Sequence, residues 1–169
     1  MKRVAVLGSS GSGKTTVGRA IAERLGVPFV ELDALHWGPE WTEAKAEDLR
    51  ARVQPIVATD AWVIDGAYRG KIGDLVIERT DVVVWLDLPA RVWFPRLLRR
   101  TVVRIIRREE FLNANRETVR QTFFSRDSLL LYAARTHRRR QRLYPAALAR
   151  YNVVRLRSQR EVDRFLRGL

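Results

Sequence analysis

The sequence predicts an α/β fold in which helices cover both faces of a parallel β-sheet, within a single domain of residues 1–169. Short apolar runs alternate with segments of helical periodicity along the whole chain, which is the pattern of repeated strand–helix units. The apolar runs are nearly continuous, as expected of strands that are buried on both faces. A glycine-rich turn joins the first run to the first helical segment. These three observations favour a three-layer architecture.

The first half of the chain is expected to alternate regularly. The strands are the short apolar runs at Arg3–Leu7, Phe29–Leu32, Trp62–Ile64 and Val82–Leu86. The helices are segments with apolar residues three or four positions apart, at Thr15–Leu25, Thr42 to about Ala58, and Ile72–Arg79. Gly26 and Pro28 end the first helix, and Thr42 is the predicted N-cap of the second.

The second half is expected to be mostly helical. Helices are predicted at Ala90 to about Arg108, Glu117 to about Arg142, Tyr144–Arg150 and Gln159–Leu169. A break is expected at Glu109–Asn115, and a fifth strand at Val153–Leu156. The sequence contains no repeat, low-complexity tract or linker that would indicate a second domain.

The segment from Gly8 to Thr15 matches G-x-x-x-x-G-K-[ST], the sequence of a phosphate-binding loop (P-loop) between a strand and a helix. The glycines let backbone N–H groups approach an anion at the helix N-terminus. Lys14 is expected to reach the β- and γ-phosphates, and the Thr15 hydroxyl to ligate Mg²⁺. The alternative is a glycine-rich turn that binds nothing. The predicted nucleotide-binding residues are Gly8, Ser10, Gly11, Ser12, Gly13, Lys14, Thr15 and Thr16.

Single carboxylates follow three of the predicted strands. Asp33, Asp65 and Asp87 each stand at or just beyond a strand end. Because ligands of such sheets bind outside the carboxyl ends of the strands, the three are candidates for holding a metal ion or a substrate. Each could instead cap the following turn or helix. That alternative is strongest for Asp87 and weakest for Asp65.

The net charge of +13 is unevenly distributed. Residues 1–90 carry 11 basic and 13 acidic side chains, whereas residues 91–169 carry 21 basic and 6 acidic ones. All basic residues of the second half are arginine. Most of them are expected to be ordinary solvated surface, and a few to bind phosphate, because the planar guanidinium matches phosphate oxygens.

Two motifs together resemble the adenylate-kinase-like phosphotransferases. The first is Gly8–Thr15, and the second is D-G-x-x-R at Asp65–Arg69. The stretches Leu32–Trp41 and Trp62–Tyr68 resemble, more closely, the subgroup known as DNA topology modulation proteins. The resemblance covers essentially the whole chain.

The resemblance implies the strand order 2-3-1-4-5 and transfer of the γ-phosphoryl group of ATP to a small acceptor, possibly a nucleoside monophosphate. It implies that Lys14 holds the phosphates and that Asp65, with Thr15, holds Mg²⁺. Arg69 would grip the acceptor phosphate. Arg96 and Arg100 would contact the nucleotide, while Arg138, Arg139 and Arg140 would close over the transferred group. The implied catalytic residues are Lys14, Asp65, Arg100 and Arg138.

The chain also departs from the family pattern. Ala67-Tyr68 stands where adenylate kinases have Phe-Pro, and the long lid is missing, so that only a short arginine-rich lid over about residues 101–126 is expected. The predicted acceptor-binding residues are Asp33, Trp37, Tyr68 and Arg69. Trp37 and Trp41 could stack on a planar acceptor or pack against the following helix.

Other function classes are excluded or left as alternatives. The chain has no cysteine, hence no disulfide or thiolate metal site, and neither His36 (expected to be partly buried) nor His137 (expected to be exposed) has a metal-ligand partner at suitable spacing. No apolar run is long enough to span a membrane, so a cytoplasmic protein is expected. The alternative function is a nucleic-acid-associated ATPase or DNA-binding regulator, favoured by the arginine-rich half. The sequence shows no nucleic-acid reading module.

Overall fold

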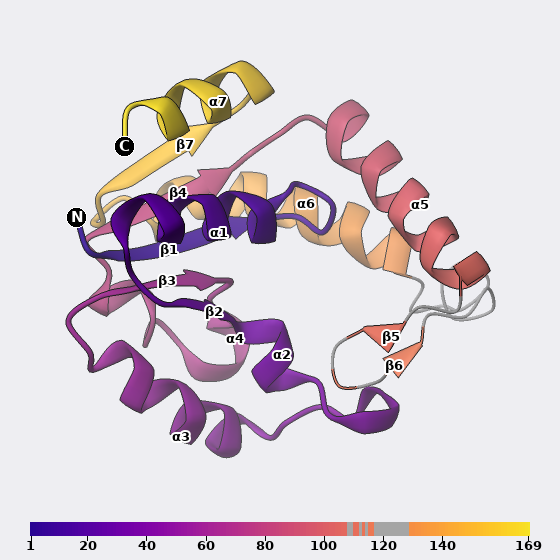
Figure 1. Ribbon diagram of the computed structural model, residues 1–169, viewed down its shortest axis with the longest axis horizontal. Helices are drawn as coiled ribbons and strands as arrows, with labels where there is room; N and C mark the ends of the chain where they lie inside the picture. Colours follow the sequence, from indigo (N-terminus) through magenta and orange to yellow (C-terminus); the bar gives the residue numbers. More distant parts are fainter. Residues whose placement is uncertain (108–109, 112, 114, 117–128) are drawn as a thin grey trace.

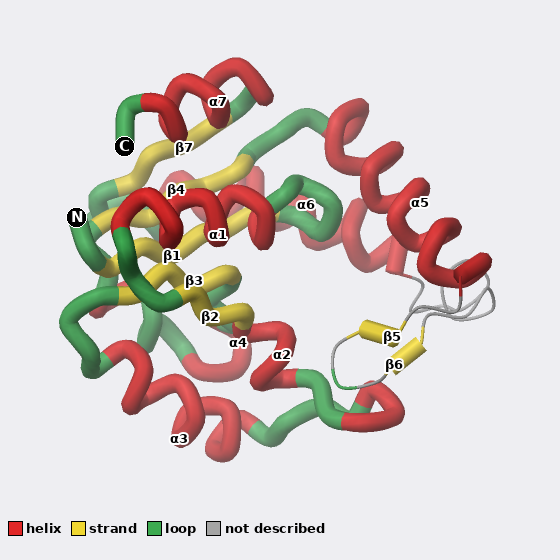
Figure 2. The backbone as a smooth tube through the Cα atoms, viewed as in Figure 1, coloured by secondary structure: helices red, strands yellow, loops and turns green. Residues whose placement is uncertain are grey.

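A parallel sheet of five strands forms the centre of the computed structural model, which describes residues 1–107, 110–111, 113, 115–116 and 129–169. Its strand order is β2-β3-β1-β4-β7, and every neighbouring pair is parallel. Figure 2 shows these strands side by side with helices around them. The predicted fold class and the order 2-3-1-4-5 are both confirmed.

The elements of the described chain are as follows. The strands of the sheet are β1 (Arg3–Gly8), β2 (Phe29–Glu31), β3 (Trp62–Asp65), β4 (Val82–Leu86) and β7 (Val153–Leu156). The helices are α1 (Lys14–Leu25), α2 (Leu32–His36), α3 (Ala46–Val57), α4 (Arg69–Ile72), α5 (Ala90–Arg107), α6 (Leu129–Ala147) and α7 (Gln159–Arg167). Two 3₁₀ turns, η1 (Pro39–Trp41) and η2 (Ile77–Arg79), and a small hairpin of β5 (Glu110–Phe111) and β6 (Asn115–Arg116) complete them.

The sheet separates two hydrophobic layers. On one face Val17 and Ile21 of α1 and Val162 of α7 pack against the strands. On the other face Leu49 and Val53 of α3 pack there, together with the C-terminal turns of α6 (Figure 1). Burial of each such aliphatic side chain contributes roughly 1.5–3 kcal/mol, which explains why the strands are continuous apolar runs. A third, smaller cluster joins α5 and α6 through Trp93, Leu97 and Ala133.

The segment after β2 differs from the prediction. The chain turns into α2 at Leu32 instead of ending a strand there, and Asp33 lies in the first turn of this helix, where a carboxylate is favourable. Thr42 is not an N-cap. Its N–H and hydroxyl both donate to Pro39 O, which closes η1, so that α3 begins only at Ala46.

From Ile72 onward, several observed elements also differ from the predicted ones. The predicted helix Ile72–Arg79 is two short pieces, α4 and η2, that surround Gly73 at φ 66°. α6 runs on through Pro145 instead of stopping before Tyr144. The hairpin lies across the predicted break at Glu109–Asn115 and ends one residue beyond it. The predicted helical residues 117–128 lie outside the described part, as does much of the predicted lid. Within the described residues, no helix is long and apolar enough to cross a membrane.

Candidate active site

The P-loop leaves the central strand β1 and leads into α1, and the eight nucleotide-binding residues predicted for the loop lie on it or on the first turn of α1. Gly11 and Gly13 have φ values of 80° and 88°, a conformation that costs other residues free energy. Gly13 is the N-cap of α1, and none of the described side chains caps this helix. The N-terminal end of α1 is thus left to bind an anion.

Lys14, Thr15 and Asp65 come together at the carboxyl ends of β1 and β3. The Thr15 hydroxyl donates to Asp65 Oδ2 at 2.7 Å, and Lys14 Nζ lies 4.0 Å from Asp65 Oδ1 and 3.4 Å from Ser9 O. Asp65 is 5% exposed, and this burial raises the pKa of its carboxyl against the opposing effect of Lys14. A buried carboxylate next to a lysine and a hydroxyl is suited to bind a cation.

A second carboxylate, Glu31, lies beside Asp65 and was not identified from the sequence. It pairs with Asp65 in the register of β2 and β3. Burial, then the neighbouring Asp65 and Asp33, raise the pKa of Glu31, and Arg19 Nη2 lies 3.9 Å from its Oε2. The sequence signal was weak because Glu31 sits inside an apolar run. The edge of the sheet thus carries one more carboxyl group than expected.

Asp33 and Tyr68 meet beside this edge. The Tyr68 hydroxyl donates to Asp33 Oδ1 at 2.6 Å, although the two residues are 35 positions apart. Tyr68 is held at φ 46°, and the Asp33 charge adds to burial in raising the pKa of its hydroxyl, so it stays protonated. The ring of His36 lies 4.5 Å from that of Tyr68. His36 is buried, more deeply than predicted.

The two tryptophans after α2 form an aromatic group with His36. The Trp37 ring is 4.7 Å from His36 and 5.6 Å from Trp41, both edge-to-face. The described hairpin contacts the same turn. Asn115 is buried, accepts from Trp41 N–H at 2.7 Å, and donates to Gly38 O at 2.8 Å. Asn113 donates to Trp37 O and to Ala34 O. The segment after α5 therefore touches the turn predicted to bind the acceptor.

Arg69 forms an ion pair with Asp74. Its Nε and Nη2 donate to the two carboxylate oxygens of Asp74 at 2.5 and 3.0 Å. The Tyr151 hydroxyl also donates to Asp74, at 3.3 Å. An acceptor anion bound by Arg69 would therefore have to replace or share this carboxylate.

The arginines predicted to face the nucleotide are placed differently from one another. Arg140 Nη1 donates to Gly8 O at 2.9 Å, directly at the start of the P-loop. Arg138 is exposed on α6. Arg96 donates to Gln159 on α7 at 3.0 Å, and Arg100 lies exposed on α5. Arg140 thus contacts the loop, and the predicted nucleotide roles of Arg96, Arg100 and Arg138 stay predictions.

His137 contradicts the expectation of an exposed residue. It is 8% exposed, and its Nδ1 lies 3.0 Å from Oγ of Ser9 on the P-loop. The basic residues around it suggested a solvated helix face, but three positions before Arg140 it lies on the side that meets the loop. Ser9 and His137 were both missed because one sequence does not reveal which side of a helix packs inward.

Asp87 is held by structural partners. Arg155 donates to its Oδ2 through Nε at 3.0 Å and Nη2 at 2.6 Å, and Gln141 donates to Oδ1 at 3.1 Å. The Arg155 guanidinium also lies 4.3 Å from the centre of the Trp85 ring. Of the three predicted carboxylates, Asp87 thus links β4, β7 and α6, and the other two lie beside the P-loop and Tyr68.

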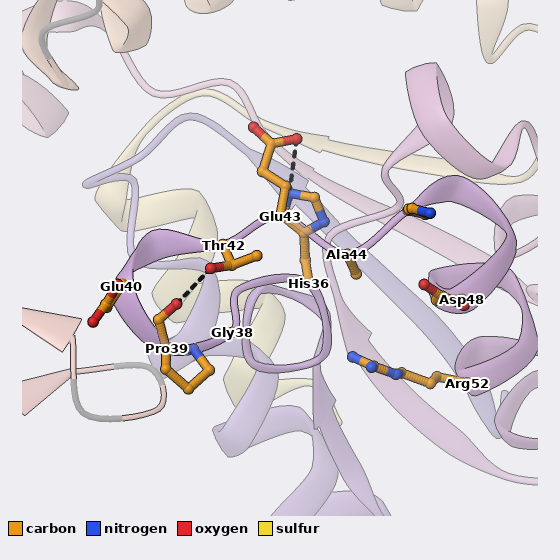
Figure 3. Close-up of a pocket in the computed structure, with 10 residues that line it drawn as sticks. His36, Gly38, Pro39, Glu40, Thr42, Glu43, Ala44, Asp48 and Arg52 are labelled. Atoms are coloured by element: carbon orange, nitrogen blue, oxygen red, sulfur yellow. Dashed lines mark hydrogen bonds and ion pairs between the residues drawn. The ribbon is translucent and has the colours of Figure 1, made fainter.

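A pocket of about 520 Å³ lies on the outer side of the turn after α2 (Figure 3). It is lined by polar and charged residues of this turn and of α3, among them His36, Glu43, Lys45 and Arg52. Glu43 points toward the His36 ring, with Oε2 3.7 Å from Nε2. Its described lining includes no P-loop residue, so it is not the nucleotide site.

The donor atoms near the P-loop fit a magnesium ion. Mg²⁺ prefers oxygen ligands and is commonly bound through one or two carboxylates together with substrate phosphates and water. The Thr15 hydroxyl and the Asp65 carboxylate supply such oxygens within 2.7 Å of each other. Among the described residues, no group of three or more His, Asp or Glu side chains forms a self-sufficient metal site.

Comparisons with known proteins agree with this geometry. The model of the ATPase family associated with various cellular activities (AAA) matches residues 4–65, from β1 to the end of β3. A shikimate kinase from Sulfurihydrogenibium sp. is 30% identical over 111 residues, which are 57% of this chain and 67% of that protein. YqaC from Bacillus subtilis is 29% identical over 101 residues, 59% of this chain. The chain spans only 56% of the length of YqaC.

The likeness extends over the whole structure. The crystal structure of a gluconokinase from Sinorhizobium meliloti matches with a TM-score of 0.56 at 25% identity, over 99% of this chain and 92% of that one. The sheet order, the P-loop and these matches point the same way. The chain belongs to the family of P-loop kinases that includes the shikimate kinases.

Proposed function

We propose that this protein is a kinase that transfers the γ-phosphoryl group of MgATP to a small, hydroxyl-bearing acceptor. The observation that carries the proposal is the meeting of Lys14, Thr15 and Asp65 at the sheet edge, next to the Asp33–Tyr68 pair. Phosphoryl transfer depends on positioning and on neutralising charge, and this edge offers both. The names of two relatives, a shikimate kinase and a gluconokinase, support the same class.

Each residue of the edge has a distinct role in this proposal. The P-loop N–H groups and the start of α1 bind the phosphates. Lys14 leaves Ser9 O, 3.4 Å away, and binds the β- and γ-phosphates. Thr15 and Asp65 would hold Mg²⁺, which supplies positive charge at the phosphate oxygens. Arg100 and Arg138 are proposed to neutralise charge on the transferred group.

The acceptor is proposed to bind between Asp33, Tyr68 and Trp37. Asp33 is oriented by the Tyr68 hydroxyl and can accept a hydrogen bond from an acceptor hydroxyl. The Arg69–Asp74 pair favours an uncharged acceptor over an anionic one, because an anion would have to replace or share the Asp74 carboxylate at Arg69. A nucleoside monophosphate is thus a weaker candidate than a neutral sugar.

Two finer assignments remain proposals. Membership of the subgroup known as DNA topology modulation proteins is supported by the Leu32–Trp41 and Trp62–Tyr68 stretches alone. Binding of nucleic acid, the alternative function, is supported by the net charge of +13. None of the contacts among the described residues adds support for it. Charge of this size binds DNA weakly and with a strong salt dependence.

The experiment is an ADP-release assay with MgATP and one candidate acceptor at a time. The acceptors are shikimate, gluconate, nucleosides, nucleoside monophosphates and other sugars, with duplex DNA as a separate sample. We expect one small acceptor to stimulate ADP release at least tenfold and Lys14→Ala to abolish it. If only DNA stimulates ADP release, the kinase proposal is wrong and the protein is a nucleic-acid-associated ATPase.

A binding measurement separates the nucleotide from the acceptor. Calorimetry with ATP and Mg²⁺ is expected to give a Kd that Lys14→Ala weakens at least tenfold. The matched control is Lys71→Ala, which removes a lysine that pairs with Glu43 at 2.7 Å, away from the P-loop. No heat from ATP with the wild-type protein would contradict the proposal.

A further inference from the structure

Two helices of the arginine-rich half, α5 and α6, pack against the first half of the P-loop (Gly8–Gly11). Arg140 of α6 donates to Gly8 O at 2.9 Å, and His137 of the same helix lies 3.0 Å from Ser9 Oγ. A Cβ on Gly11 would lie 2.5 Å from Trp93 O of α5, so these backbones are in close contact. The second half of the loop, by contrast, continues directly into α1.

The Ser9–His137 contact is buried and the Arg140–Gly8 contact is partly buried, and both come from one continuous face of α6. Ser9 is 3% and His137 8% exposed. Ala133, His137, Arg140 and Tyr144 follow each other at helical spacing. Ala133 packs with Trp93 and Leu97, and the Tyr144 ring lies 5.4 Å from that of Trp85 in the main core. α6 is therefore fixed at both ends while its middle holds the loop.

The Ser9 hydroxyl forms a hydrogen bond with His137 and does not point toward the side of the loop that would bind phosphate. Its partner atom, Nδ1, belongs to a ring that is closed in by the Trp93 ring at 5.1 Å. An unpartnered buried hydroxyl or imidazole nitrogen would cost free energy, so the pair is stabilising in the folded loop. Burial lowers the pKa of His137, with Asp87 opposing and Arg140 assisting, so the neutral ring is favoured.

We propose that His137 is a positioning residue for the P-loop: it holds Ser9, and with Arg140 at Gly8 it keeps the first half of the loop in the shape that binds the nucleotide phosphates. The inference rests on the proposed function for its link to ATP. The loop N–H groups can bind phosphate without reorganising only if this half of the loop is fixed before ATP arrives.

A double-mutant cycle tests the proposal. Ser9→Ala, His137→Ala and the double variant are compared for ATP binding by calorimetry with Mg²⁺. We expect each single change to weaken ATP binding about tenfold and the double variant to be no weaker than the worse single one, because the two residues act as a pair. Independent effects that multiply to about a hundredfold would overturn the proposal.

Two further variants separate positioning from general stability. His137→Asn places an amide near the position of Nδ1 and is expected to recover ATP binding to within threefold of wild type. Thr136→Ala is the matched control, because the Thr136 hydroxyl donates, among the described residues, to Tyr132 O and Ala133 O of its own helix α6. If Thr136→Ala weakens ATP binding as much as His137→Ala does, the proposal fails.

Amide hydrogen exchange without nucleotide tests the same idea independently of ATP. Peptides that cover Gly8–Ser12 are expected to exchange at least fivefold faster in His137→Ala than in wild type or Thr136→Ala. Unchanged exchange would overturn the positioning role even in a protein that binds ATP. If exchange is faster in His137→Ala than in wild type, but the wild-type protein binds no ATP, the positioning role is supported and the proposed function is rejected.

Discussion

Asp65 is placed where an ionised carboxylate is costly. Its oxygens have Thr15 and Lys14 as neighbours, and burial raises the pKa of its carboxyl. A carboxyl whose pKa is raised on folding lowers the stability at pH values above that pKa, and the loss is recovered as the pH falls through it. Burial of the Asp65 carboxylate therefore has a cost in stability at pH values above that pKa.

This cost predicts opposite effects of Asp65→Asn on stability and activity. The amide avoids the cost of burying a charge, so we expect the melting temperature at pH 8 to be equal to or above that of wild type. Phosphotransfer is expected to fall about 10²- to 10³-fold, as when one charge-stabilising group is lost. Thermal unfolding by circular dichroism and the ADP-release assay measure the two effects. A variant that is less stable yet fully active would contradict both.

Asp81 shows the opposite situation, a carboxylate that stabilises the fold. It accepts from the N–H groups of Lys2 and Arg3 and from the Arg3 side chain, and these bonds lower the pKa of its carboxyl to about 2. A shift of that size corresponds to about 2.5 kcal/mol, which we reduce to about 1 kcal/mol because the pair is partly exposed.

We therefore expect Asp81→Asn to lower the free energy of unfolding by about 1 kcal/mol at pH 7. The stabilisation is present above pH 4 and is lost as the pH falls toward 2, so wild type and variant should converge there. Urea titrations at pH 7, 4 and 2.5 measure the difference. A constant difference across this range would show that ionisation of Asp81 does not matter.

At the level of elements, the two glycines of the P-loop differ in their surroundings. Both have positive φ, but a Cβ on Gly11 would lie 2.5 Å from Trp93 O and 2.8 Å from Leu97 Cβ, while no described atom lies within 4 Å of one on Gly13. Glycine is thus required at position 11 both by the close packing of α5 and by the backbone conformation, whereas at position 13 only the backbone conformation requires it.

The pair of alanine variants separates these reasons. Gly13→Ala is expected to cost about 1–2 kcal/mol, for the left-handed backbone alone. Gly11→Ala adds overpacking against α5, for a total of about 2–5 kcal/mol. Chemical denaturation of both variants measures the difference. Equal losses would mean that α5 can move aside at no cost.

The hairpin after α5 offers a second test at this level. The Asn115 side chain satisfies the backbone of the Gly38–Trp41 turn at both of its ends. Asn115→Ala removes both hydrogen bonds from these partly buried backbone groups, and we expect a loss of about 1–3 kcal/mol and a raised KM for the acceptor. ATP affinity should not change, which calorimetry can check. Asn152→Ala, whose side chain donates to Asp81 O at 3.2 Å, is the control.

For the whole molecule, the arginine-rich half produces net self-repulsion. The charge of +13 on 169 residues is concentrated in residues 91–169. Added salt screens such repulsion more than it weakens the few close ion pairs. We expect the melting temperature to rise by about 2–4 °C between 10 and 150 mM NaCl, the effect of about 1 kcal/mol for a protein of this size. A fall would mean that ion pairs such as Arg155–Asp87 dominate.

The parts that could be predicted from the sequence are those governed by local patterns. The P-loop and its flanking strand and helix follow from spacing, and so do the strands Val82–Leu86 and Val153–Leu156. The places where prediction failed depend on tertiary contacts. His137 is buried because α6 turns that side toward Ser9, and Thr42 is drawn into a 3₁₀ turn by Pro39 O. Neither contact produces a local sequence pattern from which it could be predicted.

The position of Trp93 has an optical consequence. Its indole faces the ring of His137, while its backbone abuts Gly11 at the P-loop. Fluorescence from this side chain would therefore register both the charge on the imidazole and any displacement of the loop. With the other tryptophans changed to phenylalanine, the protein would carry its own spectroscopic sensor for nucleotide, with no external dye needed.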